Sequence, residues 1–182
     1  MKKYEKNELA KEILKGLAVG GFVVACFAFP GFAQVASLFA PKNERDEYRV
    51  NRAIHRLHNR KLVRIYKIGG NDVVEITHLG KRKVLEYNLA DMKLVVPKKW
   101  DGWWYIVIFD IPEKRKRGRD AVSFKIKDLG LYSLQLSIFV SPYECRREID
   151  FIGEFFGVRK YIKYIKAKEI EGEAHIKRYF NL

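Results

Sequence analysis

The chain has 182 residues, of which 48% are hydrophobic and 14% aromatic. This composition excludes a disordered chain, and the length leaves room for one large domain or two small ones. With 36 Lys and Arg against 22 Asp and Glu, the net charge is +14, which favours a polyanionic partner, either nucleic acid or an acidic membrane surface. Cys26 and Cys145 have no neighbours at metal-ligand spacing, so we read them as reduced thiols of a cytoplasmic protein.

An uncharged stretch covers residues 16–41 near the N-terminus. Its length would suit a membrane-spanning helix. Pro30 and Gly31, however, divide it into two pieces, each about the length of a buried core helix. The first helix would begin near Asn7 or Glu8, and its buried face would consist of Leu9, Ile13, Leu14 and Leu17. We expect two buried helices. The alternatives are a membrane anchor through residues 16–41 and a hydrophobic surface covered by a second subunit.

A strongly basic helix is predicted after Pro41. Its buried face would be formed by Val50, Ala53, Ile54 and Leu57. A stripe of arginines, at roughly 110° from that face, comprises Arg45, Arg49, Arg52, Arg56 and Arg60. The remaining surface carries Asn51, His55 and Asn59. Guanidinium groups suit phosphates and guanine edges, and amide groups suit adenine, so the helix could read DNA. The alternative is a solvated charged face.

A β-hairpin and another helix follow. The predicted strands, residues 62–68 and 73–77, flank the turn signal Gly69–Asp72, with Lys67 and Asn71 near the tip. Thr77 can cap the next helix, whose apolar face would be Leu79, Val84, Leu85 and Leu89. This order predicts a winged helix-turn-helix domain over residues 1–92 that binds double-stranded DNA. Residues Ile76–Gly80 resemble the turn that follows the wing in many bacterial winged-helix regulators.

The second half, residues 98–182, predicts a ferredoxin-like domain. It follows a linker that contains Pro97. The expected elements are a strand over 100–109, a helix from 112 to about 129, two strands within 131–140, a helix over 142–156 and a strand over 158–167. The order βαββαβ is that of the ferredoxin-like fold, so the whole chain is expected to be an α+β protein.

Three phrases of this half carry a family resemblance: Trp100–Gly102, Phe109–Pro112 and Leu134–Pro142. They are similar to the central domain of the phenylacetate-catabolism repressor (PaaX) family, which shares the fold of a small CRISPR adaptation protein. The resemblance implies a transcriptional regulator. The chain ends at Leu182, short of that family's further C-terminal region, so the family's acyl-coenzyme A effector is not carried over.

Asp110 is the candidate catalytic and metal-binding residue. The resemblance implies that it matches the proposed divalent-metal ligand of the CRISPR proteins, where it is paired with its twin across a dimer. One carboxylate is a sparse site for Mg²⁺ or Mn²⁺, and no neighbouring histidine offers a general base. We therefore expect Asp110 to cap a helix or hold a turn, and expect no required cofactor. The alternative is a metal-dependent nuclease or CRISPR adaptation subunit.

Five cations follow Asp110 at the start of a predicted helix: Lys114, Arg115, Lys116, Arg117 and Arg119. The positive end of the helix dipole disfavours cations there, which suggests phosphate neighbours. A second basic strip comprises Arg159, Lys160, Lys163, Lys166 and Lys168. For both, the alternative is a solvated surface. Taken together, the sequence predicts a DNA-binding transcriptional regulator, expected to be a repressor, that forms a homodimer through its C-terminal domain.

Overall fold

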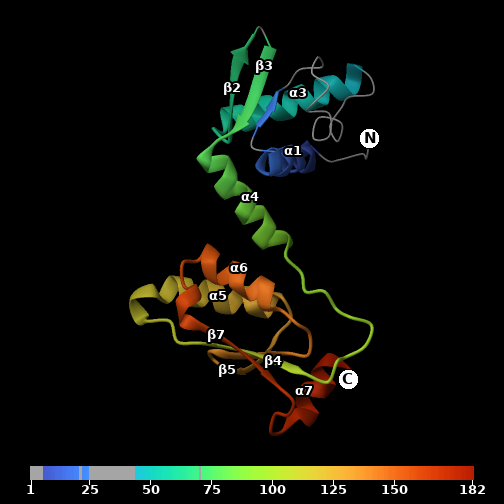
Figure 1. Cartoon of the computed structure of the whole chain (residues 1–182), viewed down its shortest axis with the longest axis vertical. Coiled ribbons are helices and arrows are strands. Elements are labelled where there is room, and N and C mark those ends of the chain that lie inside the picture. Colours follow the sequence, from blue (N-terminus) through green and yellow to red (C-terminus); the bar gives the residue numbers. More distant parts are fainter. Residues whose placement is uncertain (1–5, 21, 25–43, 70) are drawn as a thin grey trace. The chain divides into compact units, whose positions relative to one another are not determined.

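The computed structural model describes residues 6–20, 22–24, 44–69 and 71–182. The chain divides into two compact units, residues 1–90 and 91–182, and each unit has its own sheet (Figure 1). The units are described separately.

The N-terminal unit is winged-helix-like. Its elements are α1 (Lys6–Gly20), β1 (Phe22–Val24), α3 (Glu44–Asn59), β2 (Val63–Ile68), β3 (Asn71–Ile76) and α4 (His78–Asp91). The strands form an antiparallel sheet in the order β1-β3-β2. Strands β2 and β3 are the predicted hairpin, and the pairing of Ile68 with Asn71 leaves a tight turn at its tip.

The uncharged stretch departs from the prediction in its first piece. Helix α1 ends at Gly20, and Phe22–Val24 pair with β3 instead of continuing the helix. Two successive glycines weaken a helix, and the β-branched Val23 and Val24 favour a strand. The second predicted helix lies outside the described residues. None of the helices in the described part of the chain combines the length and the apolar character needed to span a bilayer.

The core of this unit lies between α1, α3 and the sheet. The predicted apolar face of α1 is confirmed, because Leu9, Ile13, Leu14 and Leu17 are all buried. They form one cluster with Ala53 and Leu57 of α3 and with Val74 of β3, while Val50 and Ile54 are partly buried against it. Burying the side chain of Leu57, which is 2% exposed, is worth about 2 kcal/mol.

The predicted apolar face of α4 is wrong in part. Val84 is buried, but Leu79 and Leu85 are 52% and 44% exposed. The helix packs through Gly80, Val84 and the half-buried Tyr87, which lie three or four residues apart on one face. The prediction placed the packed face of α4 on its leucines, whereas the helix packs on the face that contains Gly80.

Two joints connect the wing to its helices. At the end of α3, Lys61 has a positive φ of 58°, its amide donates to the His58 carbonyl (2.8 Å), and the Leu62 amide donates to the Leu57 carbonyl (2.9 Å). At the start of α4, the Thr77 hydroxyl accepts a hydrogen bond from the Gly80 amide at 3.0 Å, which confirms the predicted cap.

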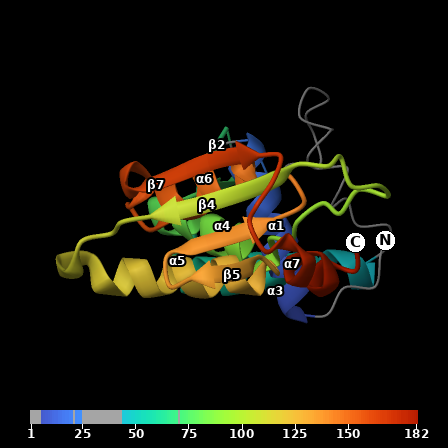
Figure 2. The ribbon, with the colours of Figure 1, turned by 90° about the horizontal axis from the view of Figure 1, so that it is seen from below.

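The C-terminal unit is the βαββαβ fold predicted from its sequence. Its elements are β4 (Trp104–Phe109), η1 (Glu113–Arg115), α5 (Lys116–Asp128), β5 (Tyr132–Gln135), β6 (Ile138–Ser141), α6 (Arg146–Phe155), η2 (Arg159–Tyr161), β7 (Ile162–Ala167) and α7 (Glu173–Phe180). The four-stranded antiparallel sheet has the order β5-β6-β4-β7, and α5 and α6 lie on the same side of it (Figures 1 and 2).

Helix α7, which was not predicted, covers part of the other side of the sheet. Its Ile176 is fully buried against Trp104 and Val140. The Trp104 indole donates to Glu173 at 2.8 Å, and Lys177 pairs with the same carboxylate. The hydrogen bond from Lys177, followed by that from Trp104, lowers the pKa of Glu173. These contacts fasten the helix to the sheet.

Replacing Gly80 with alanine should destabilise the N-terminal unit. A Cβ atom at Gly80 would lie 2.1 Å from the Leu62 carbonyl oxygen and 2.7 Å from Ile76 Cγ1, so the start of α4 would have to move. We expect Gly80→Ala to cost about 2 kcal/mol or more of unfolding free energy, measured by urea denaturation. The control Arg82→Ala changes an exposed residue of the same helix and should alter stability by less than about 0.5 kcal/mol. Equal stability of the two variants would contradict the close packing at Gly80.

Candidate nucleic-acid interface

The predicted arginine stripe does not all lie on one exposed flank, contrary to the prediction, and its last member, Arg60, follows α3 instead of belonging to it. Arg45, Arg52 and Arg60 are exposed, whereas Arg49 and Arg56 are half-buried. Arg49 pairs with Asp46 at 3.7 Å. Arg49 and Arg56 are the members of the stripe on the helix that lie nearest its apolar face, so elements that pack on that face partly cover them.

The side of α3 opposite its buried face carries groups suited to base edges. Asn51, His55 and Asn59 are exposed there, beside Arg52. Tyr48, which is 65% exposed, lies on the same side and was missed in the sequence analysis. Its position three and seven residues before Asn51 and His55 was the available signal. This surface combines hydrogen-bonding groups, one aromatic ring and one exposed guanidinium.

One cation of the wing, Arg64, is paired with a carboxylate of the wing itself. Glu75 on β3 accepts hydrogen bonds from Arg64 Nε (2.7 Å) and from the Tyr66 hydroxyl (3.1 Å), both on β2. The hydrogen bond from Arg64 lowers the pKa of Glu75, whereas burial and then the bond to Glu75 raise the pKa of Tyr66. Lys67 is exposed on β2, and Asn71 begins β3. Lys67 is therefore the wing cation that is free to meet a phosphate.

The basic run after Asp110 is partly neutralised within the domain. Glu113 pairs with Arg119 at 2.9 Å and with Lys116 at 3.8 Å. Arg115 donates to the Gly157 carbonyl at 3.1 Å, beyond the end of α6. Lys114 and Arg117 are exposed and have no ion-pair partner in residues 6–20, 22–24, 44–69 or 71–182. This run thus offers two unengaged cations rather than five.

The side chain of Asp110 is exposed and does not cap a helix. Its backbone amide donates to the Tyr161 carbonyl at 3.1 Å, which ties the end of β4 to the segment before β7. Neither η1 nor α5 has a side-chain cap, so the predicted capping role is wrong. Within the described part of the chain, no three His, Cys, Asp or Glu side chains gather into a metal site. Asp110 thus presents a single carboxylate to solvent.

The second basic strip, along β7, is interleaved with aromatic rings. Lys166 and Lys168 lie over the Trp103 ring, at 4.5 and 4.0 Å from its centroid. Lys160 lies over Tyr161 at 5.0 Å. Arg159 is engaged with Asp150 at 2.7 Å and with the Ile162 carbonyl at 2.9 Å. Lys163 is exposed. The lysines of this strip therefore remain exposed to solvent, whereas Arg159 is held by contacts within the domain.

One side of the C-terminal sheet carries a partly exposed apolar patch next to the cluster that includes Ile176 of α7. Ile106 pairs with Ile165, and Ile108 pairs with Ile138, so their side chains lie on the same side as Trp104. Ile165 is 44% exposed and the other three are half-buried. We call these four residues the isoleucine patch. Apolar surface of this kind on a sheet is suited to another apolar surface.

The fold and these surfaces define an α+β protein in which a winged-helix-like unit precedes a βαββαβ unit with a four-stranded antiparallel sheet. Residues 97–178 match the family described as PaaX protein central Cas2-like domain, which confirms the resemblance drawn from the sequence. Proteins of the PaaX family are generally transcriptional regulators and not enzymes. No curated protein matches the chain.

The pairing of Glu75 with Arg64 predicts a pH-dependent wing. Because the folded-state pKa of Glu75 is lowered, the pairing stabilises the hairpin above the ordinary pKa of a glutamate, and this stabilisation is lost as the pH falls through the lowered value. We expect the Glu75 carboxyl to titrate below its ordinary value by NMR. The Arg64→Ala variant should bring the pKa back towards that value, and an unchanged titration would contradict the role of Arg64.

Proposed function

We propose that this protein is a DNA-binding transcriptional regulator that acts as a homodimer. The observation that carries the proposal is the outward side of α3, where Tyr48, Arg52 and His55 are exposed opposite the buried Ala53 and Leu57. A helix that is fixed to a core on one side and carries such groups on the other can enter the major groove and contact base edges. Lys67 on the wing would contact the phosphate backbone beside it.

Three further features support a regulator. The net charge of +14 favours association with a polyanion. The match of residues 97–178 to a PaaX central domain connects the chain with a family of transcriptional regulators. Lys114 and Arg117, two unengaged cations of the C-terminal unit, would add sequence-independent phosphate contacts. Base contacts by α3 would then supply the sequence preference.

The isoleucine patch supports the homodimer. Two copies of the chain related by a two-fold axis would present the same apolar patch to each other, and the packing of two sheets would bury both. Such a dimer would place two copies of α3 on one DNA molecule and would favour an operator with two-fold symmetry.

Replacing cations on α3 and the wing should weaken DNA binding. We expect Arg52→Ala combined with Lys67→Ala to lower the affinity for genomic duplex fragments at least about tenfold, since each lost contact is worth ~1 kcal/mol or more. Fluorescence anisotropy across a salt series measures this affinity. The slope of log affinity against log salt should also become shallower, because phosphate contacts are lost.

The matched control for this experiment is Lys98→Ala combined with Lys127→Ala, which removes two exposed cations from the other unit. Its affinity should exceed that of the double variant of α3 and the wing. If the two double variants bind DNA equally well, the loss of affinity reflects only the loss of positive charge. This result would overturn the assignment of the DNA contacts to α3. Duplex cleavage in Mg²⁺ or Mn²⁺ that disappears in Asp110→Asn would instead favour the nuclease.

The dimer is tested by placing a charge in the isoleucine patch. Ile165→Glu should weaken dimerisation by about a hundredfold or more, because the dimer would bury an unpaired carboxylate. Analytical ultracentrifugation gives the dimer dissociation constant. Phe124→Glu is the control, since this side chain is 73% exposed on α5 and lies outside the patch. If Ile165→Glu dimerises like the unaltered chain, another surface forms the dimer.

A further inference from the structure

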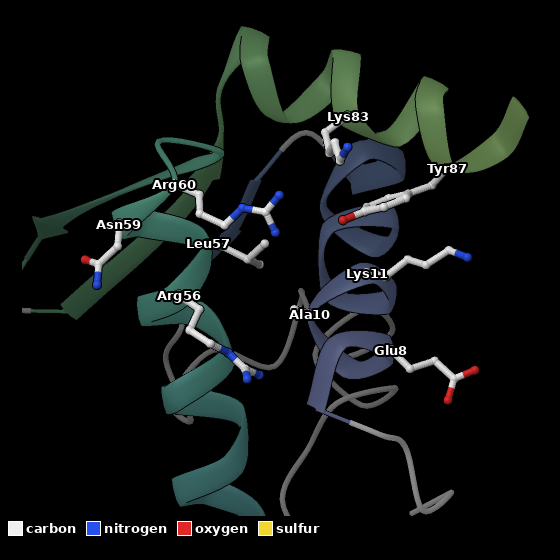
Figure 3. A pocket seen from close by; sticks show the side chains of 9 residues that line it. All are labelled: Glu8, Ala10, Lys11, Arg56, Leu57, Asn59, Arg60, Lys83 and Tyr87. Atoms are coloured by element: carbon white, nitrogen blue, oxygen red, sulfur yellow. The ribbon is translucent and has the colours of Figure 1, made fainter. Parts of the chain in front are cut away.

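A hollow opens in the N-terminal unit between α1, α3 and α4, with a volume of about 970 Å³ (Figure 3). Its floor includes Leu57, which is 2% exposed. Figure 3 shows Arg56 of α3 and Arg60, which directly follows this helix, pointing toward α1, while Lys83 and Tyr87 project from α4. The hollow is thus built from three helices of a single folded unit.

The hollow concentrates positive charge. Lys11, Arg56, Arg60 and Lys83 line it, and Glu8 is the one carboxylate among the described residues of its lining. Lys83 is paired with Glu86 outside the lining at 2.6 Å. Arg56 lies in the last turn of α3, and Arg60 follows four residues later, directly after the helix. One anion lying between these two side chains could accept hydrogen bonds from both guanidiniums.

The hollow also has an apolar side. The Tyr87 ring is half-buried, with Lys11 and Lys83 at 5.4 and 5.2 Å from its centroid. Leu57 lies on the floor beside it. The volume exceeds what a phosphate group alone requires, so the organic part of a ligand could pack against Leu57 and Tyr87 while its charged end meets the arginines.

We propose that this hollow binds a small organic phosphate, with the phosphate held by Arg56, Arg60 and Lys83. A DNA phosphate is the other source of the same chemistry. The recessed position of Arg56 and the buried floor favour a small molecule, because a duplex backbone cannot enter between helices that pack against each other.

Occupancy of the hollow would be linked to DNA binding. This step rests on the proposed function, because Arg60 directly follows α3, the helix whose exposed groups would contact bases. A ligand that holds Arg60 toward α1 withdraws that guanidinium from the DNA backbone. The organic phosphate should therefore weaken DNA binding, and DNA should weaken binding of the phosphate by the same factor.

The test uses isothermal titration calorimetry on the full chain, with AMP and inorganic phosphate as probes. We expect saturable binding of AMP that is several-fold tighter than binding of inorganic phosphate, since only AMP fills the apolar side. Arg60→Gln combined with Lys83→Gln should reduce AMP affinity about tenfold or more. Arg45→Gln combined with Arg82→Gln removes the same charge from α3 and α4 outside the hollow, and should change the affinity by less than about twofold.

Equal losses in the two double variants would overturn the proposal, since the anion would then sense only net charge. So would AMP binding no more tightly than inorganic phosphate. If neither probe binds but Arg60→Gln with Lys83→Gln weakens duplex binding, the cations serve DNA phosphates and the small-molecule site is refuted. The calorimetric titrations contain no DNA, so they test the phosphate site independently of the proposed function. A chain that binds AMP but not DNA would overturn the proposed function and would leave the proposed phosphate site standing.

Discussion

The burial of Ala53 and Leu57 against helix α1 is the contact on which the N-terminal unit depends. An α-helix fixes the direction of every side chain once one face is anchored, so this contact decides what the rest of α3 can do. It turns Tyr48, Arg52 and His55 outward and leaves Arg56 and Arg60 beside α1. One helix therefore supplies two chemically different surfaces, an outward one suited to base edges and a lateral one suited to a single anion.

In the C-terminal unit, the same kind of division follows from the alternation of side chains along β4. Tyr105, Val107 and Phe109 are buried on the side of the two long helices, while Trp104 is buried by α7 on the other. Because α7 has only eight residues, it covers one end of that side and leaves the isoleucine patch partly exposed. The short helix α7, which Glu173 holds to Trp104, thus determines how much of this side of the sheet stays open to another protein surface.

Much of the fold could be predicted from the sequence because periodicity and turn chemistry are local. The apolar spacing of Ala53 and Leu57 and the glycine turn of the wing needed no tertiary information. The errors involve contacts between distant residues. Helix α7 has one buried residue, Ile176, and so carried little periodic signal. The engagement of Arg115 with Gly157 could not be predicted, because the two groups are 42 residues apart. Predicted candidate sites therefore over-counted free cations, since ion pairing removes several of them.

The joint at Lys61 links α3 to β2 with almost no intervening chain. Its left-handed backbone is closed by two hydrogen bonds back onto the helix, and the Thr77 amide also donates to the neighbouring Leu62 carbonyl at 3.0 Å. Hinge motion between the helix and the hairpin would have to break these bonds. The separation between the outward groups of α3 and the wing tip is therefore set by the protein. A bound duplex would have to adjust its groove width to this fixed separation. The domain could therefore discriminate between DNA sequences by the groove width that they adopt.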